Sequence, residues 1–266
     1  MTATLAPRVI RTHPVMGTVA SVHVHDVVDV AVAEAAIAEM WAELDRLEDM
    51  FSTYRPTSQI SRINRGELHV LDASPEVLEV VDACTWLEHA SCGAFSARRP
   101  GDEIVDPAGF VKGWAAELAS KCLDRAGLGH WYLSVGGDIQ TRGTAHNGSP
   151  WRIAITDPNG ADPRVVRALV EVDGLAVATS GTAARGRHLW DGRTDEPAES
   201  LASMTVVGPH LTWADAFATA AFVMGRDGVE WVTNFVGYRA LAITGQGEVI
   251  RRDDQWGSPV DQPSMA

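Results

Sequence analysis

The stretch 106–113 is the densest group of residues in this sequence that could do chemistry. It places Asp106, a glycine-containing turn and Lys112 directly before a helical pattern of apolar residues. Backbone N–H groups at the start of a helix can bind an anion, and a lysine adds a point positive charge. The structural alternative is a helix capped by Asp106 with Pro107 in its first turn. The spacing leaves both interpretations open, because a loop of this kind is less specific than a P-loop.

A second candidate lies in the strongly apolar segment 213–224, which predicts a buried helix. Asp215 and Thr219 are four residues apart and share one face, with Asp215 expected in the first turn. A buried carboxylate needs a partner, and a hard cation such as Mg²⁺ would satisfy both side chains. Such an ion usually also binds phosphate oxygens of the substrate, which would link this helix to the turn at 106–113. The alternative is that Asp215 caps the helix near Thr212 and Thr219 donates to the carbonyl of residue 215.

Other catalytic templates are absent from the sequence, including GxSxG, HExxH, GxxxxGK[ST] and a GxGxxG after a strand. His23 and His25 share one face of a predicted strand, but a metal site requires at least three convergent ligands, so exposed strand histidines are expected. Asp106 and Asp138 are a conceivable acid and base pair, although acids beside glycine turns more often act as caps.

The length, composition and net charge of the chain exclude some classes of protein. The 266 residues are 45% hydrophobic and carry a net charge of −13, so they can bury the core of one large domain or two small ones. An acidic surface argues against binding to nucleic acid or an anionic membrane, but not against a cation-mediated phosphate site. Cys84, Cys92 and Cys122 lack CxxC or zinc spacing and are expected to be free thiols. No segment predicts a signal peptide or a membrane span, so a cytoplasmic protein without membrane insertion is expected.

Periodicity predicts the elements that must position these residues. Helices are expected at 29–50, 57–66, 74–89, after the 106–113 turn, at 213–224 and at 228–236. Strands are expected at 9–12, 19–25, 131–135, 139–143, 151–156, 165–172, 175–179, 204–207 and 238–244. Asp173-Gly174 predicts a hairpin between the sixth and seventh of these strands, and 188–194 is expected to be a polar loop. Arg55, Arg62 and Arg65 either steer an anionic ligand or face solvent.

Six short motifs occur in one order along the chain and together carry a resemblance. They are HPVMGT at 13–18, FSTYR at 51–55 with ISRIN at 60–64, DPAGFVKG at 106–113, GGD at 136–138, ATSG at 178–181 and ADAFAT at 214–219. In this order they resemble the ApbE family, the FAD:protein FMN transferases, over about residues 13 to 225. Each motif is weak alone, and the ordered set is specific.

The resemblance implies an α+β fold with mixed or antiparallel sheets and packed helices, as one domain over 1–266 with loose tails at 1–7 and 257–266. It implies Mg²⁺-dependent transfer of FMN from FAD to a Thr or Ser hydroxyl of an acceptor protein, with release of AMP. FAD would contact Met16, Tyr54, Gly93, Ala94, Phe95, Asp106, Lys112 and Leu189 or Trp190. The metal would be held by the carbonyl of Gly109 and the side chains of Asp215 and Thr219, which gives Asp215 a catalytic role. His188 would be the general base.

The sequence departs from the common family pattern at several places. Asp-Leu-Gly-Gly is replaced by DPAG at 106–109, Phe-Asp by FS at 95–96, and the insertion between that turn and Asp106 is nearly absent. Gly192 and Asp195 replace a proline and a glycine. These features resemble a short cytoplasmic subgroup. Two rival functions remain, an FAD pyrophosphatase that forms FMN and AMP and a non-catalytic FAD-binding protein, although intact Asp215, Thr219, Lys112 and His188 favour catalysis.

Overall fold

The computed structural model describes residues 8–26, 28–101, 104–145, 148–160, 162, 165–182, 189–252 and 256. Its centre is an eight-stranded sheet in the order β1-β2-β3-β4-β7-β10-β11-β12, in which every neighbouring pair is antiparallel. The strands are β1 (Val9–Val15), β2 (Thr18–Val24), β3 (Trp131–Val135), β4 (Asp138–Arg142), β7 (Ala176–Gly181), β10 (Ser203–Gly208), β11 (Arg239–Ile243) and β12 (Val249–Arg251). The predicted α+β class with antiparallel sheets is confirmed.

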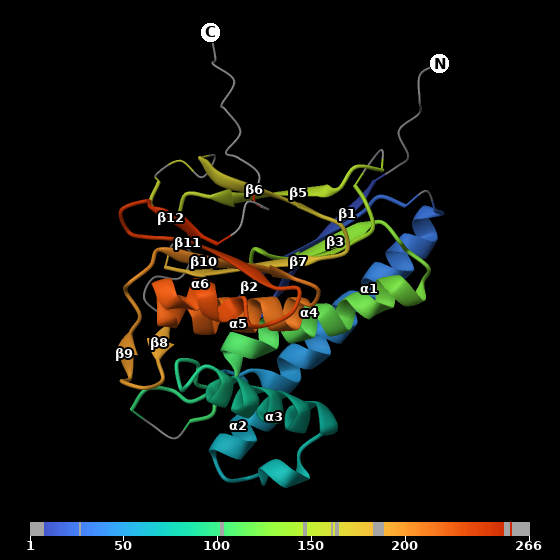
Figure 1. Ribbon diagram of the computed structural model, residues 1–266. Helices are drawn as coiled ribbons and strands as arrows, with labels where there is room; N and C mark the ends of the chain where they lie inside the picture. The colour runs from blue at the N-terminus through green and yellow to red at the C-terminus, as the bar shows by residue number, and fades with distance from the viewer. Residues whose placement is uncertain are drawn as a thin grey trace.

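Helices cover one face of this sheet and a small second sheet covers the other (Figure 1). The helices nearest the sheet are α1 (Val30–Phe51), α4 (Ala108–Arg125), α5 (Leu211–Met224) and α6 (Arg226–Val232). The second sheet pairs β5 (Trp151–Thr156) with β6 (Val166–Val172). Farther from the sheet lie α2 (Gln59–Asn64), the 3-10 helix η1 (Val70–Asp72) and α3 (Pro75–Ala90) (Figure 1).

Helix α5 is buried because it is apolar nearly all round. Its alanines allow close approach to α4 on one side and to β7 and β10 on the other. It therefore carries Asp215 into the protein interior. None of the helices in the described ranges is long and apolar enough to cross a membrane.

The face of β2 that turns away from the helices is more covered than the sequence suggested. Ala20, Val22 and Val24 are buried against the core, as the alternation predicts. His23 stacks on Tyr132 with ring centroids 4.3 Å apart, and His25 lies 4.7 Å from the ring of Trp151. The expectation of exposed strand histidines is therefore wrong, because Tyr132 of β3 and Trp151 of the β5–β6 layer cover that face.

The hairpin predicted at Asp173-Gly174 is also wrong. Strand β6 pairs with β5, whereas β7 pairs with β4 and β10 in the central sheet. The turn carries the chain from one layer to the next. Both strands are apolar because they face each other across a second core that includes Val170, Val172, Val177, Val207, Leu241 and Ile243.

Other element boundaries differ more modestly from the predictions. Strand β1 extends through residues assigned to the 13–18 turn, which shortens that turn to Met16 and Gly17. The described part of the predicted polar loop 188–194 instead belongs to a small hairpin, β8 (Trp190–Asp191) with β9 (Glu196–Pro197). Strand β12 was not anticipated. The tails 1–7 and 257–266 lie outside the described residues.

The three cysteines differ sharply in accessibility, which gives a simple test of the core. Burial raises the pKa of the Cys84 thiol to about 12 and also raises the pKa of the buried Cys122, whereas Cys92 is exposed. Because the thiolate is the reactive form, we expect one thiol to react with Ellman's reagent in the native protein and three in denaturant. Cys92→Ser should abolish the native reaction. Rapid labelling of Cys84 or Cys122 in the folded protein would contradict this packing.

Candidate functional site

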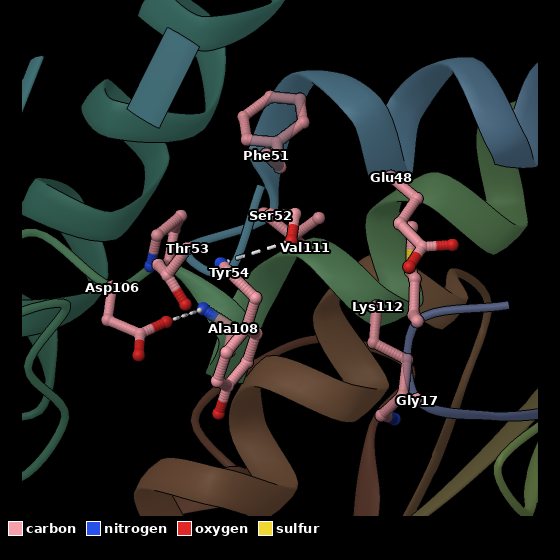
Figure 2. Close-up of a pocket in the computed structure, with 12 residues that line it drawn as sticks. Gly17, Glu48, Phe51, Ser52, Thr53, Tyr54, Asp106, Ala108, Val111 and Lys112 are labelled. Atoms are coloured by element: carbon pink, nitrogen blue, oxygen red, sulfur yellow. Dashed lines mark hydrogen bonds between the residues drawn. The ribbon is translucent and has the colours of Figure 1, made fainter. Parts of the chain in front are cut away.

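A cavity of about 400 Å³ opens between the end of α1, the β1–β2 turn and the start of α4. Figure 2 shows Tyr54, Asp106 and Lys112 around this cavity, with Glu48 on the α1 side. Its lining residues are Met16, Gly17, Glu48, Phe51, Ser52, Thr53, Tyr54, Asp106, Pro107, Ala108, Val111 and Lys112. The cavity is therefore mostly apolar, with a few polar groups, as small-molecule sites usually are. It joins four of the predicted FAD-contacting residues, Met16, Tyr54, Asp106 and Lys112.

The turn that brings Met16 to the cavity has unusual backbone geometry. Met16 has φ 52° and Gly17 has φ 68°, both in the left-handed region. A two-residue hairpin turn of this kind matches the twist of its strands, and glycine adopts it without a steric cost. A methionine there is strained. Such strain is concentrated at functional sites, which supports assigning a ligand-facing role to Met16.

Hydroxyl groups fix the segment that carries Thr53 and Tyr54. The backbone carbonyl of Ser52 accepts hydrogen bonds from the hydroxyls of Ser58, at 2.6 Å, and Ser61, at 3.2 Å. Ser58 also caps α2 by accepting the backbone N–H of Ser61. These hydroxyl groups therefore anchor the cavity wall. Tyr54 remains 92% exposed at the cavity mouth.

Two arginines near this wall are paired with carboxylates. Arg55 forms ion pairs with Glu48 and Asp49, and Arg65 pairs with Glu67 at 2.7 Å. These two side chains are satisfied by neighbouring carboxylates on the surface. The solvent-facing interpretation fits Arg55 and Arg65 better than anion steering.

Asn64 and Arg99 hold the strand-like segment that leads into α4. The side-chain amide of Asn64 donates to the carbonyl of Val105 and accepts the N–H of Val105, both at 2.9 Å. The next residue, Asp106, accepts from the N–H of Ala108 at 3.2 Å and from Arg99 Nη2 at 3.2 Å. Pro107 is the N-cap of α4. Asp106 is therefore the residue before the N-cap, and not the N-cap itself as the capping alternative had it.

The most strongly charged part of the site lies where α4, α5 and β4 meet. Lys112 forms ion pairs with Asp138 and with Asp215, the latter at 2.9 Å between Nζ and Oδ2. The carboxylate of Asp138 also accepts the N–H of Thr179 at 2.8 Å. Asp138 is 2% exposed and Asp215 is 4% exposed. Two buried carboxylates against one ammonium leave a net negative charge in this cluster, which favours a further cation.

Asp215 is buried, as predicted, but its place on the helix differs from the prediction. Helix α5 begins at Leu211, so Asp215 lies beyond the first turn and does not cap the helix. Thr212 instead contacts Glu117, with its N–H at 2.9 Å and its hydroxyl at 2.7 Å from Oε2. The hydroxyl of Thr219 lies 3.1 Å from the hydroxyl of Ser180. The structural alternative offered for Asp215 and Thr219 is therefore wrong.

Gly109 lies beside Thr219, and Gly113 lies against Asp215. A Cβ on Gly109 would come within 3.5 Å of Thr219 Cγ2, and a Cβ on Gly113 would come within 2.7 Å of Asp215 Cβ. The N–H of Gly113 donates to Asp215 Oδ2 at 2.9 Å. In a regular α-helix the N–H of Gly113 donates to the carbonyl of Gly109. Asp215 therefore competes with this carbonyl for the N–H of Gly113. The three predicted metal ligands are thus brought together from α4 and α5.

The remaining predicted contacts form a separate group next to this cluster. The turn at Gly93 supports the β8–β9 hairpin, because a Cβ on Gly192 would lie 2.6 Å from the carbonyl oxygen of Gly93. Ala94 and Phe95 are buried, and the Phe95 ring lies against Gly109. Gly93, Ala94, Phe95, Leu189 and Trp190 do not line the cavity. The predicted base His188 lies outside the described residues.

Asp138 and Ser180 are the site residues whose roles were missed from the sequence. Both lie in recognisable motifs, GGD at 136–138 and ATSG at 178–181. Asp138 was weighed as an acid and base partner of Asp106, but its contact is Lys112. Among the described residues no three His, Cys, Asp or Glu side chains converge as metal ligands. A cation here would therefore depend on hydroxyl, carbonyl and ligand oxygens as well as carboxylates.

Comparison with known proteins identifies relatives that match most of this chain. The sequence model of the ApbE family matches residues 16–99 and 96–242. An FAD:protein FMN transferase of Salmonella typhimurium (strain LT2) is 29% identical over 210 residues, which cover 74% of this chain and 58% of that one. An FAD:protein FMN transferase of Escherichia coli (strain K12) is 30% identical over 200 residues, covering 70% of this chain and 56% of that one. The match thus spans under three fifths of the length of these two relatives.

Solved structures show the same fold. The flavin transferase ApbE from Vibrio cholerae aligns with a TM-score of 0.80 at 24% identity, over 94% of this chain and 98% of that one. The ApbE protein from Thermotoga maritima aligns with a TM-score of 0.76 at 22% identity, over 93% of this chain and 97% of that one. With the family match extending over more than half of the sequence, the chain belongs to the ApbE family.

Proposed function

We propose that this chain transfers FMN from FAD to a Ser or Thr hydroxyl of an acceptor protein and releases AMP. The observation that carries the proposal is the buried cluster of Lys112, Asp138 and Asp215 at the edge of a largely apolar cavity. An apolar cavity suits an aromatic ring system. A cluster that contains a lysine and can hold a divalent cation suits a diphosphate. FAD contains both parts. The names of the two curated relatives agree with this substrate.

The donor set fits a divalent cation. The carbonyl of Gly109, the carboxylate of Asp215 and the hydroxyl of Thr219 are all oxygen donors, which Mg²⁺ prefers. The buried net negative charge of the cluster would be offset by the ion. When bound, Mg²⁺ would neutralise charge on the diphosphate and on the departing AMP phosphate. Mg²⁺ commonly completes its coordination with substrate phosphate oxygens and water, so a small set of protein ligands is sufficient.

The residues around the cavity would orient FAD. Met16 and Tyr54 offer a thioether and an aromatic ring to a planar ligand, and Phe51 adds apolar surface. Lys112 reaches from the cavity into the charged cluster, where its ammonium would contact the diphosphate. We place the further FAD contacts at Asp106, at Gly93, Ala94 and Phe95, and at Leu189 or Trp190.

The reaction replaces the phosphoanhydride bond of FAD with a phosphoester bond to the acceptor. The acceptor hydroxyl oxygen attacks the FMN phosphorus, the bond from that phosphorus to the bridging oxygen breaks, and AMP leaves with that oxygen. His188, beside Leu189 in the chain, would take the proton of the hydroxyl as a neutral imidazole. Positioning and charge neutralisation supply most of the rate in reactions of this class.

Co-expression with candidate acceptor proteins tests the proposal. We expect a protein band that stays fluorescent after denaturing electrophoresis, appears only with the intact enzyme, and shows a mass increase equal to FMN less water. The purified enzyme with FAD and Mg²⁺ separates the rival functions. Release of FMN and AMP without an acceptor would indicate a hydrolase, and FAD binding without AMP release in any condition would indicate a binding protein.

A further inference from the structure

Lys112 is shared between two buried carboxylates that are otherwise fixed. Asp215 Oδ2 accepts the backbone N–H of Gly113 at 2.9 Å, and Asp138 Oδ1 accepts the N–H of Thr179 at 2.8 Å. Each carboxylate is therefore oriented by a backbone N–H group whose position is fixed by the helix or strand that contains it. The ammonium lies at the end of a flexible four-carbon stem and contacts both acids. It is the component of this cluster that can move between them.

The two carboxylates have different surroundings. Asp215 shares its helix face with Thr219, and Thr219 lies against Gly109, so oxygen donors of three kinds are available on its side. Asp138 stands at the start of β4, and its contacts are Lys112 and the Thr179 N–H. A divalent ion would therefore bind on the Asp215 side. There it would meet an ammonium already 2.9 Å from Asp215 Oδ2.

A divalent ion and an ammonium repel strongly at such short range in a buried site. On the basis of the cation assigned to the proposed function, we infer that Lys112 contacts both Asp138 and Asp215 in the ion-free protein, and that it leaves Asp215 and keeps only Asp138 when the ion binds. Asp138 is then a positioning residue. It accepts the displaced ammonium and keeps it in the site, beside the ion, where it can contact the diphosphate.

The inference predicts effects of opposite sign on cation affinity. Lys112→Met removes the ammonium that competes with the ion for Asp215. The FAD-free protein should then bind Mn²⁺ about tenfold more tightly than wild type, since the loss of one contact between charges changes a binding constant by about that factor. Asp138→Asn removes the alternative acceptor and confines the ammonium to Asp215, so Mn²⁺ binding should weaken about tenfold. Purely structural damage would weaken binding in both variants.

Mn²⁺ titration of the full-length, FAD-free protein followed by electron paramagnetic resonance measures these affinities directly. Lys121→Met and Asp124→Asn are matched controls, because both residues lie exposed on the same helix, α4. Both controls should bind Mn²⁺ like wild type. The melting temperature of each variant checks that it is folded. Lys112→Gln serves as a second replacement if Lys112→Met does not fold, because it keeps a polar side chain beside the two acids.

The outcomes separate this inference from the proposed function. Tighter Mn²⁺ binding by the Lys112 variant together with weaker binding by the Asp138 variant supports the exchange. Unchanged or weaker binding by the Lys112 variant overturns it, as does unchanged binding by the Asp138 variant, or the absence of binding in both wild type and the Lys112 variant. If Asp215→Asn binds Mn²⁺ as wild type does, the cation site itself is wrong and the proposed function loses its support.

Discussion

Replacing Asp215 with asparagine should lower Mg²⁺-dependent AMP release from FAD by about a thousandfold, the order expected when one preorganised electrostatic group is lost. Asparagine keeps the shape of the side chain, and its oxygen can still accept the N–H of Gly113. The charge that would hold the cation is lost. AMP release is measured by chromatography, in the presence of the acceptor identified by co-expression.

Glu117→Gln is the matched control for this prediction. Glu117 also joins α4 to α5, through His210 at 2.8 Å and Thr212 at 2.7 Å, but it lies outside the cluster around Lys112. Its replacement should reduce the free energy of unfolding slightly and leave AMP release near the wild-type rate. Wild-type AMP release by Asp215→Asn would remove Asp215 from the mechanism, whereas equal losses in both variants would indicate that helix packing is what matters.

Gly113→Ala is expected to damage both the fold and the site. The added Cβ would lie 2.7 Å from Asp215 Cβ and 2.7 Å from the carbonyl oxygen of Leu211. A backbone carbonyl cannot move aside without shifting α5, so α4 and α5 must separate. We expect the free energy of unfolding to fall by about 1–3 kcal/mol, as for other overpacked cores. AMP release should fall as well, because the same shift separates Asp215 from Lys112. Urea unfolding and the AMP assay measure the two effects.

Gly245→Ala provides the comparison for this substitution. Nothing lies within 4 Å of a Cβ placed on Gly245, so the variant should match the wild type in stability and AMP release. If Gly113→Ala behaves like Gly245→Ala, the close contact between α4 and α5 does not constrain the site.

Local patterns were sufficient to predict the parts of the site that lie on one element. The apolar run of α5 predicts burial, and the four-residue spacing places Asp215 and Thr219 on one face. The first-turn position was wrong because α5 begins at Leu211, before the apolar run that set the predicted boundary. Helix starts are weakly determined by periodicity when polar residues such as Thr212 precede the run.

Contacts between distant segments could not be predicted in the same way. Lys112 meets Asp138 and Asp215 because β4 and α5 are placed beside α4 by the order of strands in the sheet. Periodicity carries no information about that order. The same limit explains the wrong hairpin at Asp173-Gly174, because an apolar alternating strand suits either a neighbouring strand or a second layer.

The role of the polar segment 51–64 shows a third case. It carries the FSTYR and ISRIN motifs, and its hydroxyl and amide side chains bind backbone groups of Ser52 and Val105. Any residue type offers such backbone groups. The sequence therefore indicates that Asn64 and Ser58 are engaged, without indicating what they hold.

In the proposed mechanism a divalent cation joins Asp215 of α5 to the diphosphate of FAD, and calorimetric titration of FAD tests this most directly. We expect the wild-type protein to bind FAD at least about tenfold more tightly in Mg²⁺ than in EDTA, a coupling of ordinary size between two ligands at one site. Asp215→Asn should bind FAD equally in both conditions. The same FAD affinity in Mg²⁺ and EDTA for the wild-type protein would contradict the account.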